Sequence, residues 1–467
     1  MPYSSLVRLG RRQFLGAAGA AGLLSWSRPR AQAHREADLH AGEGVVDTSP
    51  PLGLELGGYH RSPGNERRVQ GIRQNTAARA LVLRQGQQQV AILSIDIASV
   101  SSDFTHRVQQ RVNQQTGIPA ENVRVCATHT HSMPAFSYLR QWGAIPVDYK
   151  RQVEGQCVEA VVRAMADLAP AELSLGKSRA HGANFNRTTA DFRTDEEFTA
   201  DSDDSQRWLD TLVQLLLFQR VGEKRDLLWY HFSAHPVCFA DTQAGPDWPG
   251  TVAEQVRERF GLEASFLCGH AGDVNPGDGE PWRGDVDKAT RGVFDAICRA
   301  LDALEPVRVD QLRSLTQPFG VPLDRDLFNA WREAYRENPE QCARGHWVNA
   351  GFAADWYQGN ADRDLTDAHH TIRLSALQLG SVALVFHPAE LYSVYGLMIR
   401  RDSPFADTLA VGYCDDIIGY LTDPTAYARG EYAALTVPKI LDIPPFTPDA
   451  AREFTEEVRT LLIQLKG

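Results

Sequence analysis

The sequence lacks several features that would assign its class directly. No stretch approaches the roughly 20 apolar residues needed for a membrane-spanning helix, and neither H-E-x-x-H nor G-x-S-x-G occurs. These absences exclude a zincin-type metalloprotease helix and the nucleophile elbow of an α/β-hydrolase. The seven cysteines are odd in number and show no C-x-x-C spacing. We therefore expect buried small apolar side chains rather than a disulfide framework.

Positively charged residues are outnumbered, with 48 Lys and Arg against 59 Asp and Glu and a formal net charge of −11. Five of the arginines lie in the first 33 residues, which contain no lysine or acid. The rest of the chain is therefore even more acidic, and it would repel nucleic-acid phosphates. We expect no nucleic-acid partner. The length of 467 residues and the 43% hydrophobic content allow a large core, in one α/β unit or two merged ones.

The N-terminus has the three parts of an export signal. Arg11 and Arg12 precede a weakly apolar Gly/Ala-rich run, and A-Q-A at residues 31–33 is a cleavage-site pattern. The segment 1–33 is similar to a twin-arginine signal peptide, which directs folded proteins across a membrane. We therefore predict a periplasmic or secreted protein with one functional domain at residues 34–467.

Strand-like and helix-like segments alternate along that domain, which predicts a layered α/β fold. The expected strands are 79–83, 89–97, 123–131, 211–218, 227–233, 264–269 and 381–387. The expected helices are 102–115, 149–168, 251–260, 289–304 and a C-terminal helix over 449–465. Residues 320–370 are predicted to be a helical insertion rich in Trp, Arg and Asn, suited to a lid or a substrate wall.

One segment imitates a nucleotide site. A-E-L-S-L-G-K-S at residues 171–178 resembles a phosphate-binding loop with alanine in place of its first glycine. R-A-H-G-A-N-F follows where such a loop would open a helix. We therefore expect no nucleotide binding here.

The stretch V-R-V-C-A-T-H-T-H ends in two histidines one residue apart. On an extended strand, His129 and His131 would share one face at the strand's carboxyl end. One histidine can then bind a metal while its neighbour handles a proton. The alternative is a strand end that carries polar residues without function.

A second pair of histidines, His231 and His235, lies in the segment W-Y-H-F-S-A-H-P. On an extended strand these two side chains would again share one face. We expect His231 to be structural and His235 to bind a metal. Asp247 in the following D-W-P-G can accept a hydrogen bond from a ligand histidine.

In V-A-L-V-F-H-P-A-E, Glu390 is either a helix N-terminal charge or a metal ligand. Side-chain chemistry alone does not indicate Tyr420 in G-Y-L-T as a metal ligand, because a tyrosine side chain usually packs half-buried in the core.

An ordered set of motifs resembles the catalytic domain of the neutral/alkaline non-lysosomal ceramidases. The set spans roughly residues 43–440 and consists of G-G-Y near Tyr59, T-H-T-H-S, G-A-N-F-N-R, F-S-A-H-P, G-D-V-N-P, P-A-E and G-Y-L-T. The resemblance implies one zinc ion per chain, held by His129, His235, Glu390 and Tyr420. It also implies that His131 is the general acid and that Arg187 and Tyr432 hold the scissile carbonyl oxygen.

The implied chemistry is physically consistent. Zinc with an open coordination position lowers the pKa of a bound water from about 15.7 to about 7. A cation and a phenol hydroxyl that already lie beside the amide oxygen before the reaction would stabilise the negative charge that develops on it. His131, two residues from a ligand, can carry a proton to the departing amine.

The chain departs from the ceramidase pattern in three ways. Asn275 replaces a serine in G-D-V-N-P, and asparagine cannot form an acyl-enzyme, so the reaction would depend on metal-activated water. The sequence ends before the immunoglobulin-like C-terminal domain of full-length ceramidases. The segment 320–370 can reshape the approach for a long acyl chain.

We therefore predict a zinc-dependent hydrolase that cleaves the amide bond of ceramide or a related N-acyl lipid-like substrate, with peripheral membrane contact allowed. One alternative is a metallohydrolase of a polar cell-envelope amide, ester or sugar derivative, which Trp/Asn/Asp walls would favour. Another is an inactive, zinc-stabilised binding protein. Oligomeric state does not follow from the sequence.

Overall fold

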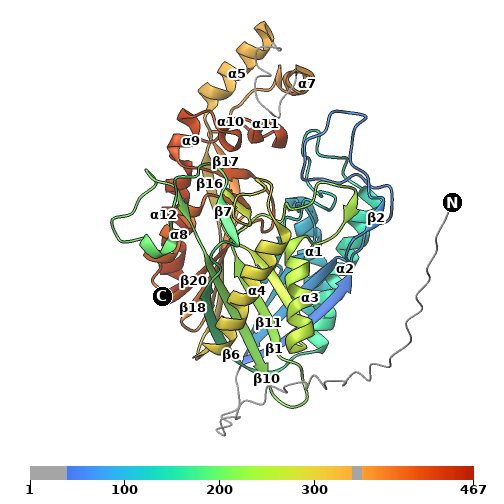
Figure 1. Cartoon of the computed structure of the whole chain (residues 1–467), viewed down its shortest axis with the longest axis vertical. Coiled ribbons are helices and arrows are strands. Elements are labelled where there is room, and N and C mark those ends of the chain that lie inside the picture. Colours follow the sequence, from blue (N-terminus) through green and yellow to red (C-terminus); the bar gives the residue numbers. More distant parts are fainter. Residues whose placement is uncertain (1–38, 339–349) are drawn as a thin grey trace, which may run out of the picture. The chain divides into compact units, whose positions relative to one another are not determined.

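The computed structural model describes residues 39–338 and 350–467 (Figure 1). By its internal contacts the chain divides into Met1–Arg35 and Glu36–Gly467. The predicted signal peptide lies outside the described residues. All elements below belong to the second unit, and no helix in its described part is long and apolar enough to cross a membrane.

Two β-sheets form the centre of this unit. The larger sheet consists, in spatial order, of β13 (Ala264–Cys268), β11 (Leu227–Phe232), β10 (Leu212–Arg220), β6 (Ala169–Arg179), β1 (Leu39–Asp47), β3 (Ala77–Gln85), β4 (Gln88–Ile95) and β5 (Val123–Ala127), with β15 (Glu305–Val307) beside β6. The smaller sheet consists of β16 (Leu312–Pro322), β17 (His369–Leu379), β18 (Val382–Phe386) and β20 (Asp407–Val411). Short strand pairs are β2 (Gly71–Ile72) with β12 (Gln243–Ala244), β7 (Asn184–Asn186) with β14 (Val274–Pro276), β8 (Arg193–Thr194) with β9 (Trp208–Leu209), and β19 (Ala389–Leu391) with β21 (Gly419–Leu421).

Helices cover the outer faces of both sheets. Those after the early strands are α1 (Ser102–Thr116), α2 (Val147–Ala166), α3 (Trp248–Phe260) and α4 (Val286–Asp302). The later helices are α5 (Arg325–Glu337), α7 (Ala350–Asn360), α8 (Ser393–Asp402), α9 (Pro424–Ala428), α10 (Tyr432–Leu435), α11 (Val437–Leu441) and α12 (Ala450–Lys466). In Figure 1, α8 and α12 lie on one side of the sheets and α1 to α4 on the other.

The layers follow from burial of apolar faces. Side chains such as Leu81 and Leu173 of the larger sheet share a core with Leu377 and Leu384 of the smaller sheet. A second core lies between the larger sheet and α1 to α4, and a third lies between the smaller sheet and α8 and α12. Burying both faces of each sheet gives four layers, helix, sheet, sheet, helix. The predicted layered α/β fold is confirmed.

The segment that imitates a phosphate-binding loop belongs to β6. Its residues 171–178 pair antiparallel with β10 along their length. The segment is therefore part of a β-sheet, and its backbone N–H groups are not arranged as a loop that binds a phosphate.

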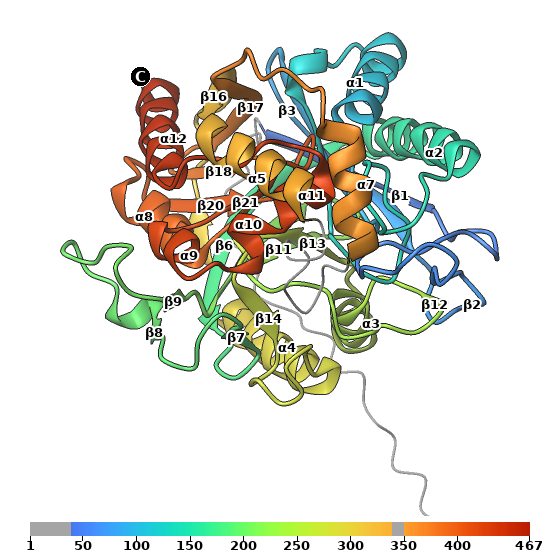
Figure 2. The ribbon, with the colours of Figure 1, turned by 90° about the horizontal axis from the view of Figure 1, so that it is seen from above.

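Strands from both sheets end at one edge of the molecule. β5 runs parallel to β4, β11 to β13, and β18 to β20. Beyond the strand ends the two sheets are joined, since Ala127 N donates to Tyr413 O (3.0 Å) and Gly412 N donates to Cys268 O (3.0 Å). Loops at such carboxyl ends are where open α/β sheets usually bind ligands. Figure 2 views the molecule from above, with α5, α7, α10 and α11 nearest the viewer.

A buried ion pair fastens the two sheets together near this edge. Arg124 of β5 lies 2.7 Å from Asp415 and donates a hydrogen bond of 2.7 Å to Ser375 Oγ of β17. Asp415 also accepts a hydrogen bond from Val125 N at 2.8 Å. The Arg124 side chain is 1% exposed, so its charge depends on these partners.

Arg124→Ala should lower the free energy of unfolding by about 3–5 kcal/mol, because it leaves the buried Asp415 carboxylate uncompensated. Denaturant unfolding measures this value. The matched control is Arg151→Ala, whose pair with Asp148 has side chains 73% and 100% exposed. The control should change stability by less than about 0.5 kcal/mol. Equal losses in both variants would contradict the assigned role.

Candidate metal centre

The first histidine pair lies in the loop after β5, which ends at Ala127. His129 adopts a positive φ of 64°, a conformation uncommon for residues other than glycine and often found at functional sites. The turn brings His129 Nε2 and His131 Nε2 to 3.1 Å. The prediction that both histidines share a strand face is therefore wrong. Loop geometry, not strand alternation, brings the rings together.

The second pair separates where β11 ends at Phe232. His231 remains in the strand, and its Nε2 lies 2.8 Å from Ala410 O, which fits the expected structural role. His235 lies beyond the strand end, so the two do not share a strand face as expected. The His235 ring is fully buried, with its centroid 5.0 Å from that of His129.

Backbone carbonyls fix the orientation of both ligand candidates. His129 Nδ1 lies 2.7 Å from Ala98 O, and His235 Nδ1 lies 3.0 Å from Val274 O. A carbonyl only accepts, so each Nδ1 carries the proton and each Nε2 presents a lone pair. The expectation that Asp247 would perform this task is wrong. Asp247 instead caps α3, where it accepts a hydrogen bond from Trp248 N at 2.7 Å.

Glu390 and Tyr420 meet because β19 and β21 are parallel and place them opposite each other in register. Glu390 Oε2 lies 3.2 Å from His235 Nε2 and 3.5 Å from His129 Nε2. Burial raises the pKa of Glu390, but the adjacent His129 and His235 outweigh burial and hold this pKa well below its usual value. Glu390 is therefore a buried carboxylate, not an exposed helix-terminal charge.

Arg187 follows β7 and lies beside the same group. Its guanidinium donates to Tyr420 OH (2.7 Å) and to Gly272 O (2.8 Å). Tyr432 is the first residue of α10. Burial and the charge of Glu390 raise the pKa of Tyr432, while Arg187 lowers it, so both charges lie within electrostatic reach of this phenol. All seven residues predicted for the site are thus in one neighbourhood.

The donor set suits a divalent metal. One ring nitrogen from each of His129, His131 and His235 lies within 4.8 Å of the other two. Burial is the main cause that lowers the pKa of His131, and it lowers the pKa of His235 to about 4. Both imidazoles are therefore neutral at neutral pH, which is the form that binds metal. Neutral imidazoles with a carboxylate are typical ligands for zinc.

Several residues of the neighbourhood carried no sequence signal. The Tyr413 ring stacks on His129 with centroids 4.2 Å apart, and its hydroxyl lies 3.5 Å from His235 Nε2. Asp273 accepts hydrogen bonds from Ser393 N (2.8 Å) and Asn186 Nδ2 (2.7 Å), which ties the segments after Glu390 and before Arg187 together. Asp273 belongs to the G-D-V-N-P motif, which is the one clue to its importance.

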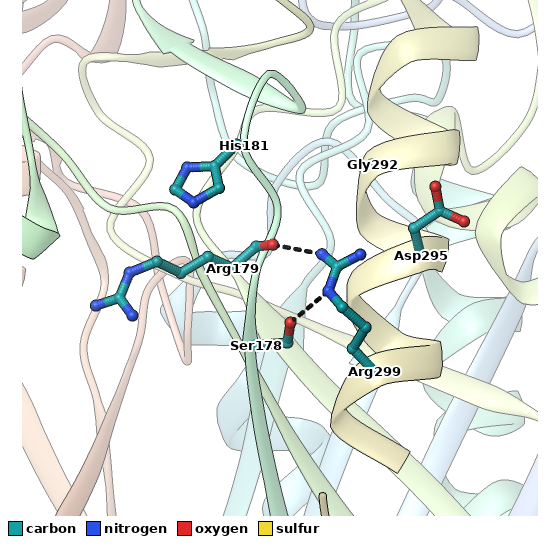
Figure 3. Close-up of a pocket in the computed structure, with 6 residues that line it drawn as sticks. All are labelled: Ser178, Arg179, His181, Gly292, Asp295 and Arg299. Carbon is teal, nitrogen blue, oxygen red and sulfur yellow. Dashed lines mark hydrogen bonds between the residues drawn. The ribbon is translucent and has the colours of Figure 1, made fainter. Parts of the chain in front are cut away.

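A separate surface pocket lies between the end of β6 and α4 (Figure 3). Its lining residues are Ser178, Arg179, His181, Gly292, Asp295 and Arg299. Arg299 donates to Ser178 Oγ (3.1 Å) and Arg179 O (2.7 Å). None of the seven predicted site residues lines this pocket.

Comparisons with known proteins agree with this arrangement. The family model for neutral/alkaline non-lysosomal ceramidase, N-terminal, matches residues 40–252. The neutral ceramidase of Mycobacterium tuberculosis is 25% identical over 482 residues, which cover 84% of this chain and 73% of that protein. The neutral ceramidase of Pseudomonas aeruginosa is 24% identical over 226 residues, which cover 45% of this chain and 33% of that protein.

Solved structures share the fold. The crystal structure of neutral ceramidase from Pseudomonas aeruginosa has a TM-score of 0.69 at 18% identity and covers 92% of this chain and 74% of its own. A structure described as ceramidase complexed with C2 has a TM-score of 0.71 at 18% identity, with coverage of 92% and 75%. The family match over residues 40–252 and the similarity to neutral ceramidase over most of the chain support a hydrolase of the neutral/alkaline non-lysosomal ceramidase type that acts on amide bonds.

Proposed function

We propose that the chain is a zinc-dependent hydrolase that cleaves the amide bond of an N-acyl lipid-like substrate, either ceramide or a related N-acyl amide. The observation that carries this proposal is the convergence of two imidazole Nε2 lone pairs and one buried carboxylate within 3.5 Å. His129, His235, Glu390 and Tyr420 would hold the metal. Zinc in such a site supplies an activated water at neutral pH.

Arg187 and Tyr432 are proposed to hold the scissile carbonyl oxygen. Arg187 is preorganised because its guanidinium is tied to Gly272 O and Tyr420 OH. The charges of Tyr420 and Glu390 outweigh burial and raise the pKa of Arg187, so it stays cationic. A fixed cation and a phenol hydroxyl lower the energy of the negative charge that builds on the oxygen during attack.

His131 is proposed to move the proton. Its pKa is lowered, so the ring is neutral and can take a proton from the attacking water. The same ring can then give that proton to the departing amine nitrogen, which leaves poorly without one. Its Nδ1 has no hydrogen-bond partner among the described residues, so no backbone group fixes its tautomer.

Asn275 limits the choice of mechanism. Its amide cannot attack a carbonyl carbon, so the proposed reaction is direct attack by water without an acyl-enzyme. An inactive zinc-stabilised binding protein is the less favoured alternative, because His131, Arg187 and Tyr432 are not needed for metal binding alone. A small polar amide or ester remains the competing substrate class.

Residues 1–33 are proposed to direct export of the folded protein, so that the substrate is met in the periplasm or outside the cell. The basis is the sequence pattern around Arg11 and Arg12. Peripheral contact with a membrane would then bring the protein to lipid-like substrates.

Removing the metal, or the ligand His235, should remove activity and lower stability together. Zinc that binds only the folded state stabilises that state by roughly 2.7 kcal/mol when the free zinc concentration is about 100 times Kd. Chelated wild-type protein should therefore melt at a lower temperature, and zinc should restore both its melting temperature and its turnover of N-lauroylethanolamine. His235→Ala should not respond to zinc. A variant of the exposed His106, His106→Ala, is the control and should behave as wild type.

His131→Ala should separate metal binding from proton transfer. We expect about one zinc per chain, as in a single closed site, while turnover of N-lauroylethanolamine falls by roughly 10²–10⁴. Metal content by mass spectrometry and steady-state kinetics measure the two effects. Loss of zinc together with activity would instead make His131 a ligand.

A further inference from the structure

The His131 ring packs against an aromatic neighbour, Tyr59. The Tyr59 ring packs edge-on against the His131 ring with centroids 5.3 Å apart. Tyr59 OH donates to Val237 O at 2.5 Å, which fixes the ring. A Cβ added at Gly58 would lie 2.4 Å from His131 Cβ, so this segment is pressed against the histidine. Whatever approaches His131 from this side therefore meets Tyr59.

Two arginines, Arg67 and Arg283, lie against the Tyr59 ring, and a third, Arg61, lies near Arg67. The Arg67 guanidinium carbon lies 4.6 Å from the ring centroid, and that of Arg283 lies 5.5 Å from it. Burial, and then the charges of Arg61 and Arg283, lower the pKa of Arg67 to about 10 although Tyr59 and Asp241 oppose this. The positive charge of Arg67 is therefore close enough to be repelled by both Arg61 and Arg283.

No carboxylate of the described residues lies within 4.0 Å of these three guanidinium groups. Arg67 donates to backbone carbonyls, including His131 O at 2.6 Å, and Arg61 donates to His60 O at 2.9 Å. The nearby carboxylate of Asp247 is engaged by the backbone N–H of Trp248. Acids outnumber bases in this chain, so three neighbouring arginines without a carboxylate in direct ion-pair contact are unusual.

Arg283 is the most available of the three. It is exposed, and it forms no hydrogen bond or ion pair within the part of the chain that the structure describes. Its loop is held in place, because Asn275 Nδ2 donates to Trp282 O (2.8 Å) and Trp282 Nε1 donates to Arg187 O (3.3 Å). The loop thus spans from Arg187, on the oxygen side of the site, to Tyr59, on the His131 side.

The proposed roles of Arg187 and His131 indicate which half of the substrate would lie near these arginines. Arg187 holds the carbonyl oxygen, and His131 gives its proton to the amine nitrogen. Arg283 and His131 both lie against the Tyr59 ring. An amine half that leaves the site on the His131 side would pass Tyr59 and come close to Arg283.

We propose that Arg283, with Arg61 and Arg67 beside it, recognises a carboxylate on the amine half of the substrate, so that the preferred substrates are N-acyl amino acids. This inference rests on the proposed function. A guanidinium matches a carboxylate through two parallel hydrogen bonds. The neighbouring cations and the flanking rings of Tyr59 and Trp282 strengthen this attraction, because they add charge and displace water.

Two substrates with the same acyl chain test the proposal on the zinc-loaded full chain. N-lauroylglycine carries a carboxylate where N-lauroylethanolamine carries a hydroxymethyl group. We expect wild-type kcat/KM to be higher for N-lauroylglycine. In Arg283→Gln the ratio of the two kcat/KM values should fall about tenfold, mainly through KM. The ratio should fall less in Arg283→Lys, which keeps the charge.

Arg259→Gln is the matched control, since Arg259 is an exposed arginine on α3 that packs on Phe260. It should leave the ratio unchanged. Equal or better use of N-lauroylethanolamine by the wild type, or an unchanged ratio in Arg283→Gln, would overturn the carboxylate site and leave the proposed function intact. Hydrolysis of neither amide, nor of ceramide, by zinc-loaded protein would overturn both.

Discussion

The packing of the two sheets against each other is the constraint on which the site depends. The ligand candidates come from the carboxyl ends of β5 and β11 in one sheet and from the segments after β18 and β20 in the other. No single sheet contains the set. The shared apolar core, the Arg124 to Asp415 ion pair and the hydrogen bond from Ala127 to Tyr413 hold the strand ends in place. Such contacts fix the positions of the side chains in advance, as electrostatic preorganisation requires.

Charged and hydrogen-bonding groups surround the candidate metal centre on different sides. The Nε2 atoms of His129 and His235 face the buried Glu390 carboxylate, and their Nδ1 atoms are bound to backbone carbonyls. The Arg187 cation lies against Tyr420, on the side where oxygen charge would develop. Further cations lie beyond Tyr59, on the side of the proposed proton donor. In the proposed reaction, Arg187 would bind the oxygen side of the amide, and the arginines near Tyr59 would lie on its amine side.

Local sequence predicted local structure well. The helix expected at 102–115 is Ser102–Thr116, and the one expected at 289–304 is Val286–Asp302. Strand alternation failed for His129 with His131 and for His231 with His235, because in each pair the chain leaves the strand before the last histidine. The period of two holds only inside a strand. The resemblance to ceramidases supplied Tyr420, whose approach to Glu390 depends on pairing between segments 30 residues apart. Tyr413 and the arginines around Tyr59 depend on contacts across the fold, which no local pattern encodes.

The central claim is that His129, His235, Glu390 and Tyr420 hold one divalent ion. A crystal structure of the zinc-loaded protein, with anomalous scattering recorded at the zinc edge, tests it most directly. The account predicts a single strong peak about 2.0–2.2 Å from the Nε2 atoms of His129 and His235 and from a carboxylate oxygen of Glu390. A peak at any other place in the chain, or none at these residues in protein that has bound zinc, would contradict it.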